Sequence, residues 1–106
     1  MENKKILGLI GLAAKAGRIS FGADSVELQT RKGKVYLIIL AQNSSERTKE
    51  KFRKISKERK IPIIITETIE TLSKAIGKNN KAILGIEDVS LSNAIQKIYN
   101  GGEAIG

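Results

Sequence analysis

The sequence predicts an α/β protein with a three-layer α/β/α sandwich, in which about five helices flank a four-stranded mixed sheet. Two observations support this fold class. Helix-patterned segments alternate with short apolar segments along all 106 residues, which is typical of helices packed on a central sheet. The segments 35–41 and 61–66 are almost wholly apolar, as strands that are covered on both faces must be. Because no repeat or linker divides the chain, we expect a single domain over 1–106, with an ordered core at about 4–100.

The first three expected elements are a helix, a strand and a helix. Residues 4–15 carry apolar side chains at the spacing of one helical face, and Gly17 ends that helix. A short strand is expected at 19–21. The second helix covers 22–31, and basic residues follow it, where the helix dipole favours cations.

The same alternation continues to the end of the chain. Strands are expected at 35–41, 61–66 and 82–86, and helices at 46–60, 68–76 and from Asp88 or Ser90 to about residue 100. Polar residues are expected to cap these helices. Ser20 or Asp24 would cap the second helix, and Asn43 with Glu46 has the spacing of a capping box for the third. The last four residues are expected to be loose.

The charge of the chain points to a polyanionic partner. It has 19 Lys and Arg against 11 Asp and Glu, a net charge of +8 and a pI near 9.9, so nucleic acid is the simplest partner. A lysine-rich surface without a ligand is the alternative. With two Phe, two Tyr and no Trp, a row of stacking rings is not expected. The basic segment 46–60 is either a solvated face or a secondary RNA surface.

Several function classes are not expected. The chain has no Cys and no His, so it lacks thiolates and the commonest general base and metal ligand. Gly77-Lys78 resembles the end of a phosphate-binding loop, but Leu72 stands where that loop requires a glycine. We therefore expect no enzyme activity, cofactor or metal. The apolar runs are too short to span a membrane and no signal-peptide cleavage site is visible, so a cytoplasmic location is expected.

The turn at 22–25 is the first candidate site. It begins a helix, and a helix N-terminus offers unpaired backbone N–H groups and the positive end of the dipole. Basic residues flank the turn on both sides in the sequence. We therefore expect the phosphate backbone of a nucleic acid to bind there.

Several short sequence motifs along the chain are similar to those of a known protein family. They are Leu7-Gly8-Leu9, 13–18 (AAKAGR), Gly22, Arg31-Lys32-Gly33, the polar loop and basic helix at 43–60, Ile61-Pro62, 72–77 (LSKAIG) and the strand 82–86. In this order they cover about residues 5–99. With them the chain resembles the kink-turn-binding ribosomal protein superfamily of the L-seven-Ae and L-thirty-e type, and within it the small bacterial YlxQ-like members.

This resemblance implies binding of RNA kink-turns, with the N-terminus of the second helix against tandem G·A pairs. In well-studied members that turn reads Gly-x-Asn-Glu-x-x-Lys. Here Gly22 is kept, while Asp24 replaces Asn, Ser25 replaces Glu and Leu28 replaces Lys. Ionised Asp only accepts hydrogen bonds, and the phosphate contact of the Lys is lost. Reduced kink-turn specificity, or another folded RNA as ligand, therefore stays open.

The resemblance also implies a set of RNA contacts. Backbone and short polar groups of Gly22, Ala23, Asp24 and Ser25 would approach the bases. The loop 86–89 would support a flipped nucleotide through Glu87, Asp88 and Val89. Phosphates would be held by Lys15, Arg18, Arg31, Lys32 and Lys78. The expected function is that of a non-catalytic, monomeric RNA-binding protein associated with ribosomes or translation; a protein-interaction scaffold and a small-ligand-binding α/β domain are the alternatives.

Overall fold

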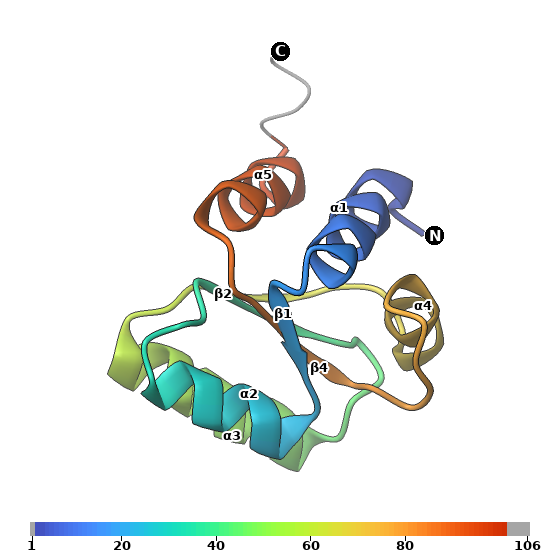
Figure 1. Ribbon diagram of the computed structural model, residues 1–106. Coiled ribbons are helices and arrows are strands. Elements are labelled where there is room, and N and C mark those ends of the chain that lie inside the picture. Colours follow the sequence, from blue (N-terminus) through green and yellow to red (C-terminus); the bar gives the residue numbers. More distant parts are fainter. Residues whose placement is uncertain (1, 102–106) are drawn as a thin grey trace.

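The computed structural model describes residues 2–101 and forms three layers (Figure 1). The loose C-terminus expected at 103–106 lies outside the described residues. The elements are α1 (Lys4–Lys15), β1 (Ile19–Phe21), α2 (Ala23–Arg31), β2 (Leu37–Leu40), α3 (Glu46–Arg59), β3 (Ile63–Ile65), α4 (Ile69–Ala75), β4 (Ile83–Ile86) and α5 (Val89–Tyr99). The predicted α/β fold with five helices and a four-stranded mixed sheet is therefore confirmed.

The sheet has the strand order β1-β4-β2-β3. Only β2 and β3 are parallel, whereas β4 runs antiparallel to both of its neighbours, β1 and β2. In the β1–β4 pair, Ile19 lies opposite Ile86 and Phe21 lies opposite Leu84. The end of β4 is therefore next to the start of β1, and the start of β4 is next to the end of β1. This register decides which loops can share a binding surface.

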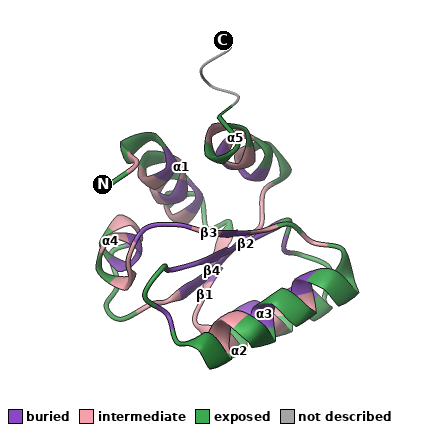
Figure 2. Cartoon of the chain, turned by 180° about the vertical axis from the view of Figure 1, so that it is seen from behind, coloured by how far each residue is buried: buried purple, intermediate pink, exposed green. Residues whose placement is uncertain are grey.

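Helices cover both faces of the sheet, and a hydrophobic cluster fills each of the two interfaces. Helices α1, α4 and α5 lie over one face, and α2 and α3 lie over the other (Figures 1 and 2). Side chains from alternate positions of β2 enter the two clusters: Leu37 and Ile39 enter the first, and Ile38 and Leu40 enter the second. All four are fully buried, which explains why the sequence of this strand is apolar at every position.

Glycines end α1 and α2 as the sequence predicts. Gly17 and Gly33 follow the helices with φ of 69° and 75°, and each allows the next residue to bond back to the last turn. The Arg18 N–H donates to the Ala13 carbonyl at 2.8 Å, and the Lys34 N–H donates to the Gln29 carbonyl at 3.0 Å. These two bonds satisfy carbonyls that a helix end leaves unpaired.

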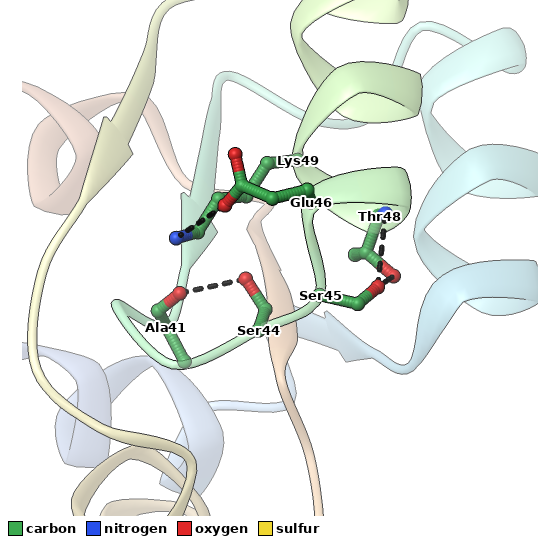
Figure 3. A network of polar contacts seen from close by, with 6 residues as sticks. All are labelled: Ala41, Ser44, Ser45, Glu46, Thr48 and Lys49. Atoms are coloured by element: carbon green, nitrogen blue, oxygen red, sulfur yellow. Dashed lines mark hydrogen bonds and ion pairs between the residues drawn. The ribbon is translucent and has the colours of Figure 1, made fainter.

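The N-cap of α3 differs from the prediction. Ser45, not Asn43, caps the helix: its Oγ accepts from the Thr48 N–H at 3.1 Å and donates to the Thr48 Oγ1 at 2.9 Å (Figure 3). Asn43 lies two residues before the cap, and its Oδ1 accepts from the N–H of Ile69 at 2.9 Å instead. The expected capping box is therefore wrong, because Asn43 binds the start of α4 and Ser45 directly precedes α3.

Candidate nucleic-acid interface

The turn at the start of α2 is built around Gly22. Its φ of 89° and ψ of 152° lie in a region that residues with a side chain rarely adopt. Its N–H donates to the carbonyl of Ile83 at 2.9 Å, which fixes the start of α2 beside the start of β4. A Cβ at this position would meet no atom within 4 Å. The glycine therefore leaves the backbone open to a ligand.

Gly22 is itself the N-cap of α2, so the predicted caps Ser20 and Asp24 are wrong. Ser20 is a buried residue of β1, opposite Gly85. Asp24 lies inside the first turn of the helix, and no side chain among the described residues caps that turn with a hydrogen bond. The cause is the backbone conformation, because the cap position falls on the one residue that tolerates this φ.

The first N–H groups of α2 remain available. Within residues 2–101, the N–H groups of Ala23, Asp24 and Ser25 have no protein acceptor, and the first backbone bond of the helix is from the Val26 N–H to the Gly22 carbonyl. The other four helices are different, because each has a side-chain acceptor at its N-cap. Backbone donors and the positive dipole end of α2 therefore face outward together.

Two lysines of the loop between α4 and β4 lie beside this turn. The Nζ atoms of Lys78 and Lys81 are each 5.4 Å from the centre of the Phe21 ring, within range of a cation–π contact. The Ser73 Oγ holds the loop by accepting from the Lys81 N–H at 2.7 Å. The structure therefore brings the predicted Lys78 to the ring of Phe21, the residue that precedes Gly22, and it adds Lys81, which the sequence analysis missed.

The remaining predicted residues of this turn form the exposed face of α2. Asp24, Ser25 and Leu28 are all exposed, and 53% of Leu28 is accessible to solvent. These are the positions at which the sequence departs from the Gly-x-Asn-Glu-x-x-Lys pattern. The departures therefore change the surface that a ligand would meet and leave the core intact.

Glu27, next to this face, joins α2 to α3. Its carboxylate is 2.7 Å from Arg31 and 3.0 Å from Lys51. The hydrogen bond from Lys51 lowers the pKa of Glu27 below its usual value; the charges of Lys51 and Arg31 add to this effect, and partial desolvation opposes it. Arg31, a predicted phosphate contact, is therefore engaged within the protein.

The other predicted contacts lie at the opposite end of β1 and α2. Because Ile19 pairs with Ile86, the loop 86–89 lies beside the start of β1, and the Glu87 N–H donates to the Arg18 carbonyl at 2.9 Å. Asp88 caps α5 through the Leu91 N–H at 2.8 Å, and Val89 is half exposed. The structure therefore does not bring these residues to Gly22, and Lys15, Arg18 and Lys32 likewise belong to the turns at this far end.

Neither a candidate metal cluster nor a membrane-spanning helix lies within residues 2–101. No group of three or more His, Cys, Asp or Glu in the range 2–101 is placed to hold a metal ion. No helix in the same range has both the length and the apolar character needed to cross a bilayer.

Comparison with known proteins gives a consistent result. The model of the ribosomal protein L7Ae/L30e/S12e/Gadd45 family matches residues 4–96. A protein of Enterococcus faecium named "RNA-binding protein YlxQ" is 28% identical over 100 residues, which are 94% of this chain and 96% of the relative. The protein of the same name from Bacillus subtilis (strain 168) is 26% identical over 95 residues, which are 90% of this chain and 95% of the relative.

Two solved structures are also similar. A Bacillus halodurans protein of unknown function has a TM-score of 0.89 and 28% identity, over 92% of this chain and 99% of that chain. The Giardia lamblia 15.5kD RNA binding protein has a TM-score of 0.76 and 19% identity, over 100% of this chain and 94% of that chain. The second likeness concerns the fold alone.

Proposed function

The chain belongs to the ribosomal protein L7Ae/L30e/S12e/Gadd45 family, and from this premise we propose that it is a non-catalytic RNA-binding protein. Its ligand is a kink-turn or a similarly bent, structured RNA, recognised through the N-terminus of α2. Two relatives that match over nearly their full length are named RNA-binding proteins, and the net charge of +8 suits a polyanion. The protein acts as a monomer in the cytoplasm, on ribosomal or other translation-associated RNA.

One observation carries the proposal: the start of α2 is an open set of donors with two cations beside it. The N–H groups of Ala23, Asp24 and Ser25 lack protein acceptors within residues 2–101, while Lys78 and Lys81 both contact the ring of Phe21, which directly precedes the turn in the chain. Backbone donors at a helix N-terminus bind anions and base acceptors, and the lysines neutralise phosphates of the same RNA. A solvated lysine-rich surface needs no such arrangement.

Each part of this surface has a role in the binding step. Gly22 lets the RNA come close to the backbone, because it has no Cβ and open space lies there. The Asp24 carboxylate and the Ser25 hydroxyl accept hydrogen bonds from base amines, and Lys78 and Lys81 bind the phosphate backbone of the RNA. The protein binds the bent conformer better than the straight one, and that difference in affinity shifts the RNA towards the bent shape.

The altered residues of the turn set the expected selectivity. The Asp24 carboxylate repels phosphate where Asn would also donate, and Leu28 adds no charge where Lys would contact the backbone. We expect weaker discrimination between a kink-turn and other bent RNAs than the Gly-x-Asn-Glu-x-x-Lys pattern gives. Lys78 and Lys81 partly compensate for the missing cation of position 28.

A titration tests the proposal. A labelled kink-turn RNA and a matched duplex without the G·A pairs are titrated with the protein at about 50 and 200 mM salt, the range over which phosphate contacts weaken most visibly. We expect tighter binding of the kink-turn at both salt concentrations. Equal and steeply salt-dependent binding of the two RNAs would contradict it, and absence of RNA affinity would favour the scaffold or small-ligand alternative.

Two glycine variants make the test specific to the turn. Gly22 and Gly33 have φ of 89° and 75°, and a Cβ would meet nothing within 4 Å at either position. Gly22→Val and Gly33→Val each place a side chain at a positive φ, at opposite ends of α2. Only Gly22→Val is expected to abolish the preference for the kink-turn; an equal loss in both variants would assign the effect to folding and contradict the proposed site.

A further inference from the structure

A hollow lies at the end of β1 and α2 that is remote from the Gly22 turn. It measures about 340 Å³ and is lined by Arg18, Gly33, Lys34, Tyr36 and Glu87. The antiparallel register brings these residues together, because the starts of β1 and β2 both lie beside the end of β4, where Ile19 and Leu37 are paired with Ile86. The hollow is therefore fixed by the sheet and is separated from the Gly22 turn by the nine residues of α2, about 13 Å.

The two cations of the hollow are not explained by helix ends. Cations in the last turn or at the cap, such as Lys15 and Arg31, complement the negative end of a helix dipole. Arg18 and Lys34 lie beyond the C-caps of α1 and α2, where this effect has fallen off. Both are exposed, and neither forms an ion pair with another residue in the range 2–101. They are free to hold phosphates.

Tyr36 gives the hollow an aromatic surface. Its backbone is held on both sides, because its N–H donates to the Ile86 carbonyl at 2.8 Å and its carbonyl accepts from the Ser92 Oγ at 3.2 Å. The neighbours Val35 and Leu37 are buried, yet 44% of Tyr36 is exposed. An exposed ring next to two cations is the combination on which an unpaired base stacks while its phosphates are neutralised.

Glu87 adds a group that can read the base. One oxygen of its carboxylate accepts from the Gln29 Nε2 at 3.4 Å; the other has no partner within the described part of the chain. The Glu87 N–H is bonded to the Arg18 carbonyl, so the residue is anchored in the hollow. A carboxylate accepts hydrogen bonds only, so it pairs with the exocyclic amine of cytosine and repels the O4 carbonyl that uracil has at the same position.

We propose that this hollow is a second RNA site, which binds one unpaired nucleotide whose base carries an exocyclic amine. The base stacks on Tyr36 and donates its amine to Glu87, and the adjoining phosphates lie against Arg18 and Lys34. The inference shares with the proposed function the idea that RNA is the ligand, but it uses different residues at a different end of the sheet. A single-stranded extension of a structured RNA would occupy it.

The first experiment compares short single-stranded RNAs. Labelled oligocytidine and oligouridine pentamers are titrated with the wild-type protein, with Tyr36→Ala and with Tyr99→Ala. Tyr99 is the matched control, because it is also 44% exposed. We expect the cytidine oligomer to bind more tightly, Tyr36→Ala to weaken that binding about tenfold or more, as loss of one base–aromatic stack does, and Tyr99→Ala to leave it unchanged. Equal effects of the two Tyr variants would overturn the assignment.

A second variant tests the reading of the base. In Glu87→Gln the side chain can donate as well as accept, so we expect the preference for cytidine over uridine to disappear while overall binding persists. An unchanged preference would overturn the role of Glu87. Binding of free CMP as tight as that of the oligomer would overturn RNA as the ligand.

A cross-comparison separates this site from the proposed function. Gly22→Val should lose kink-turn binding and keep oligocytidine binding, and Tyr36→Ala should do the reverse. Kink-turn binding without any oligocytidine binding would overturn the second site alone. Oligocytidine binding that depends on Tyr36, without a kink-turn preference, would overturn the proposed function and leave the second site standing.

Discussion

The backbone N–H of Gly22 donates to the carbonyl of Ile83 at 2.9 Å, and this bond joins the start of α2 to the start of β4. The loop that precedes β4 is thereby placed beside the N-terminus of α2, and its two lysines lie against Phe21. Segments about 60 residues apart in the sequence thus form one surface of donors and cations.

Removing the charge of Lys81 should weaken RNA binding through the phosphates. In Lys81→Ala, we expect the affinity for a kink-turn RNA to fall and the slope of log affinity against log salt to become shallower by about one unit, the change expected when one phosphate contact is lost. Titrations at several salt concentrations measure this slope. The control is Lys97→Ala, which removes an exposed lysine of α5. An equal change in affinity and salt slope in this variant would indicate a general charge effect.

A Cβ on Gly85 should destabilise the sheet. It would lie 2.7 Å from the Ser20 Oγ and 3.0 Å from a methyl carbon of Val35, so Gly85→Ala overpacks the interior and is expected to lower the free energy of unfolding by about 1–3 kcal/mol. Urea unfolding measures this change in the free energy of unfolding. Because the nearest atom is the Ser20 Oγ, Ser20→Ala in the same chain should restore part of the loss.

Gly8 provides the opposite case. It is exposed within α1, and a Cβ there would meet nothing within 4 Å. Gly8→Ala should therefore stabilise the protein by up to about 1 kcal/mol through helix propensity alone. A destabilising Gly8→Ala would contradict the open space described at Gly8, and a stabilising Gly85→Ala would contradict the packing described around β4.

Glu27 should contribute stability that depends on pH. Since Lys51 and Arg31 lower its pKa in the folded protein, the stabilisation is present at neutral pH and is lost as the pH falls through that lowered pKa. The free energy of unfolding of the wild type should exceed that of Glu27→Gln by less than about 1 kcal/mol at pH 7, as is usual for exposed ion pairs, and the difference should vanish at an acidic pH below the lowered pKa of Glu27. Urea unfolding at both pH values tests this; at 1 M salt the difference at pH 7 should also shrink.

The two candidate caps near α3 can be separated by hydrogen exchange. Ser45→Ala removes the acceptor for the Thr48 N–H and should cost about 1 kcal/mol. Asn43→Ala removes the acceptor for the Ile69 N–H instead. We expect faster amide exchange at Thr48 in the first variant and at Ile69 in the second; the reverse pattern would restore the capping box that the sequence suggests.

Local signals made most of the helices predictable. The bounds of α1 agree with the sequence prediction, because both signals that define the helix are local: its apolar residues recur at helical spacing, and Gly17 ends it. Strand β1 also has the predicted bounds, whereas β2, β3 and β4 are shorter than predicted, since residues such as Val35 and Thr66 are buried without belonging to the ladder. The caps were less predictable because several polar residues compete, and Asn43 finds its partner 26 residues away.

The arrangement of the site depended on pairing that the sequence does not display. Gly22 was identifiable because its turn is local. The antiparallel β1–β4 register is not local, and it moves Arg18 and the 86–89 loop to the far end while bringing Lys81 to the turn. The same register creates the hollow around Tyr36, which no spacing in the sequence indicates.

Amide mapping of the protein with kink-turn RNA tests the proposed surface most directly. The ¹H–¹⁵N spectrum is recorded as the RNA is added, and each shifted amide is assigned to its place in the fold. We predict the largest shifts at residues 22–26 and 78–83, on the two sides of the Gly22–Ile83 bond. Shifts confined to α3, or spread evenly over all exposed basic residues, would contradict recognition of RNA by the start of α2.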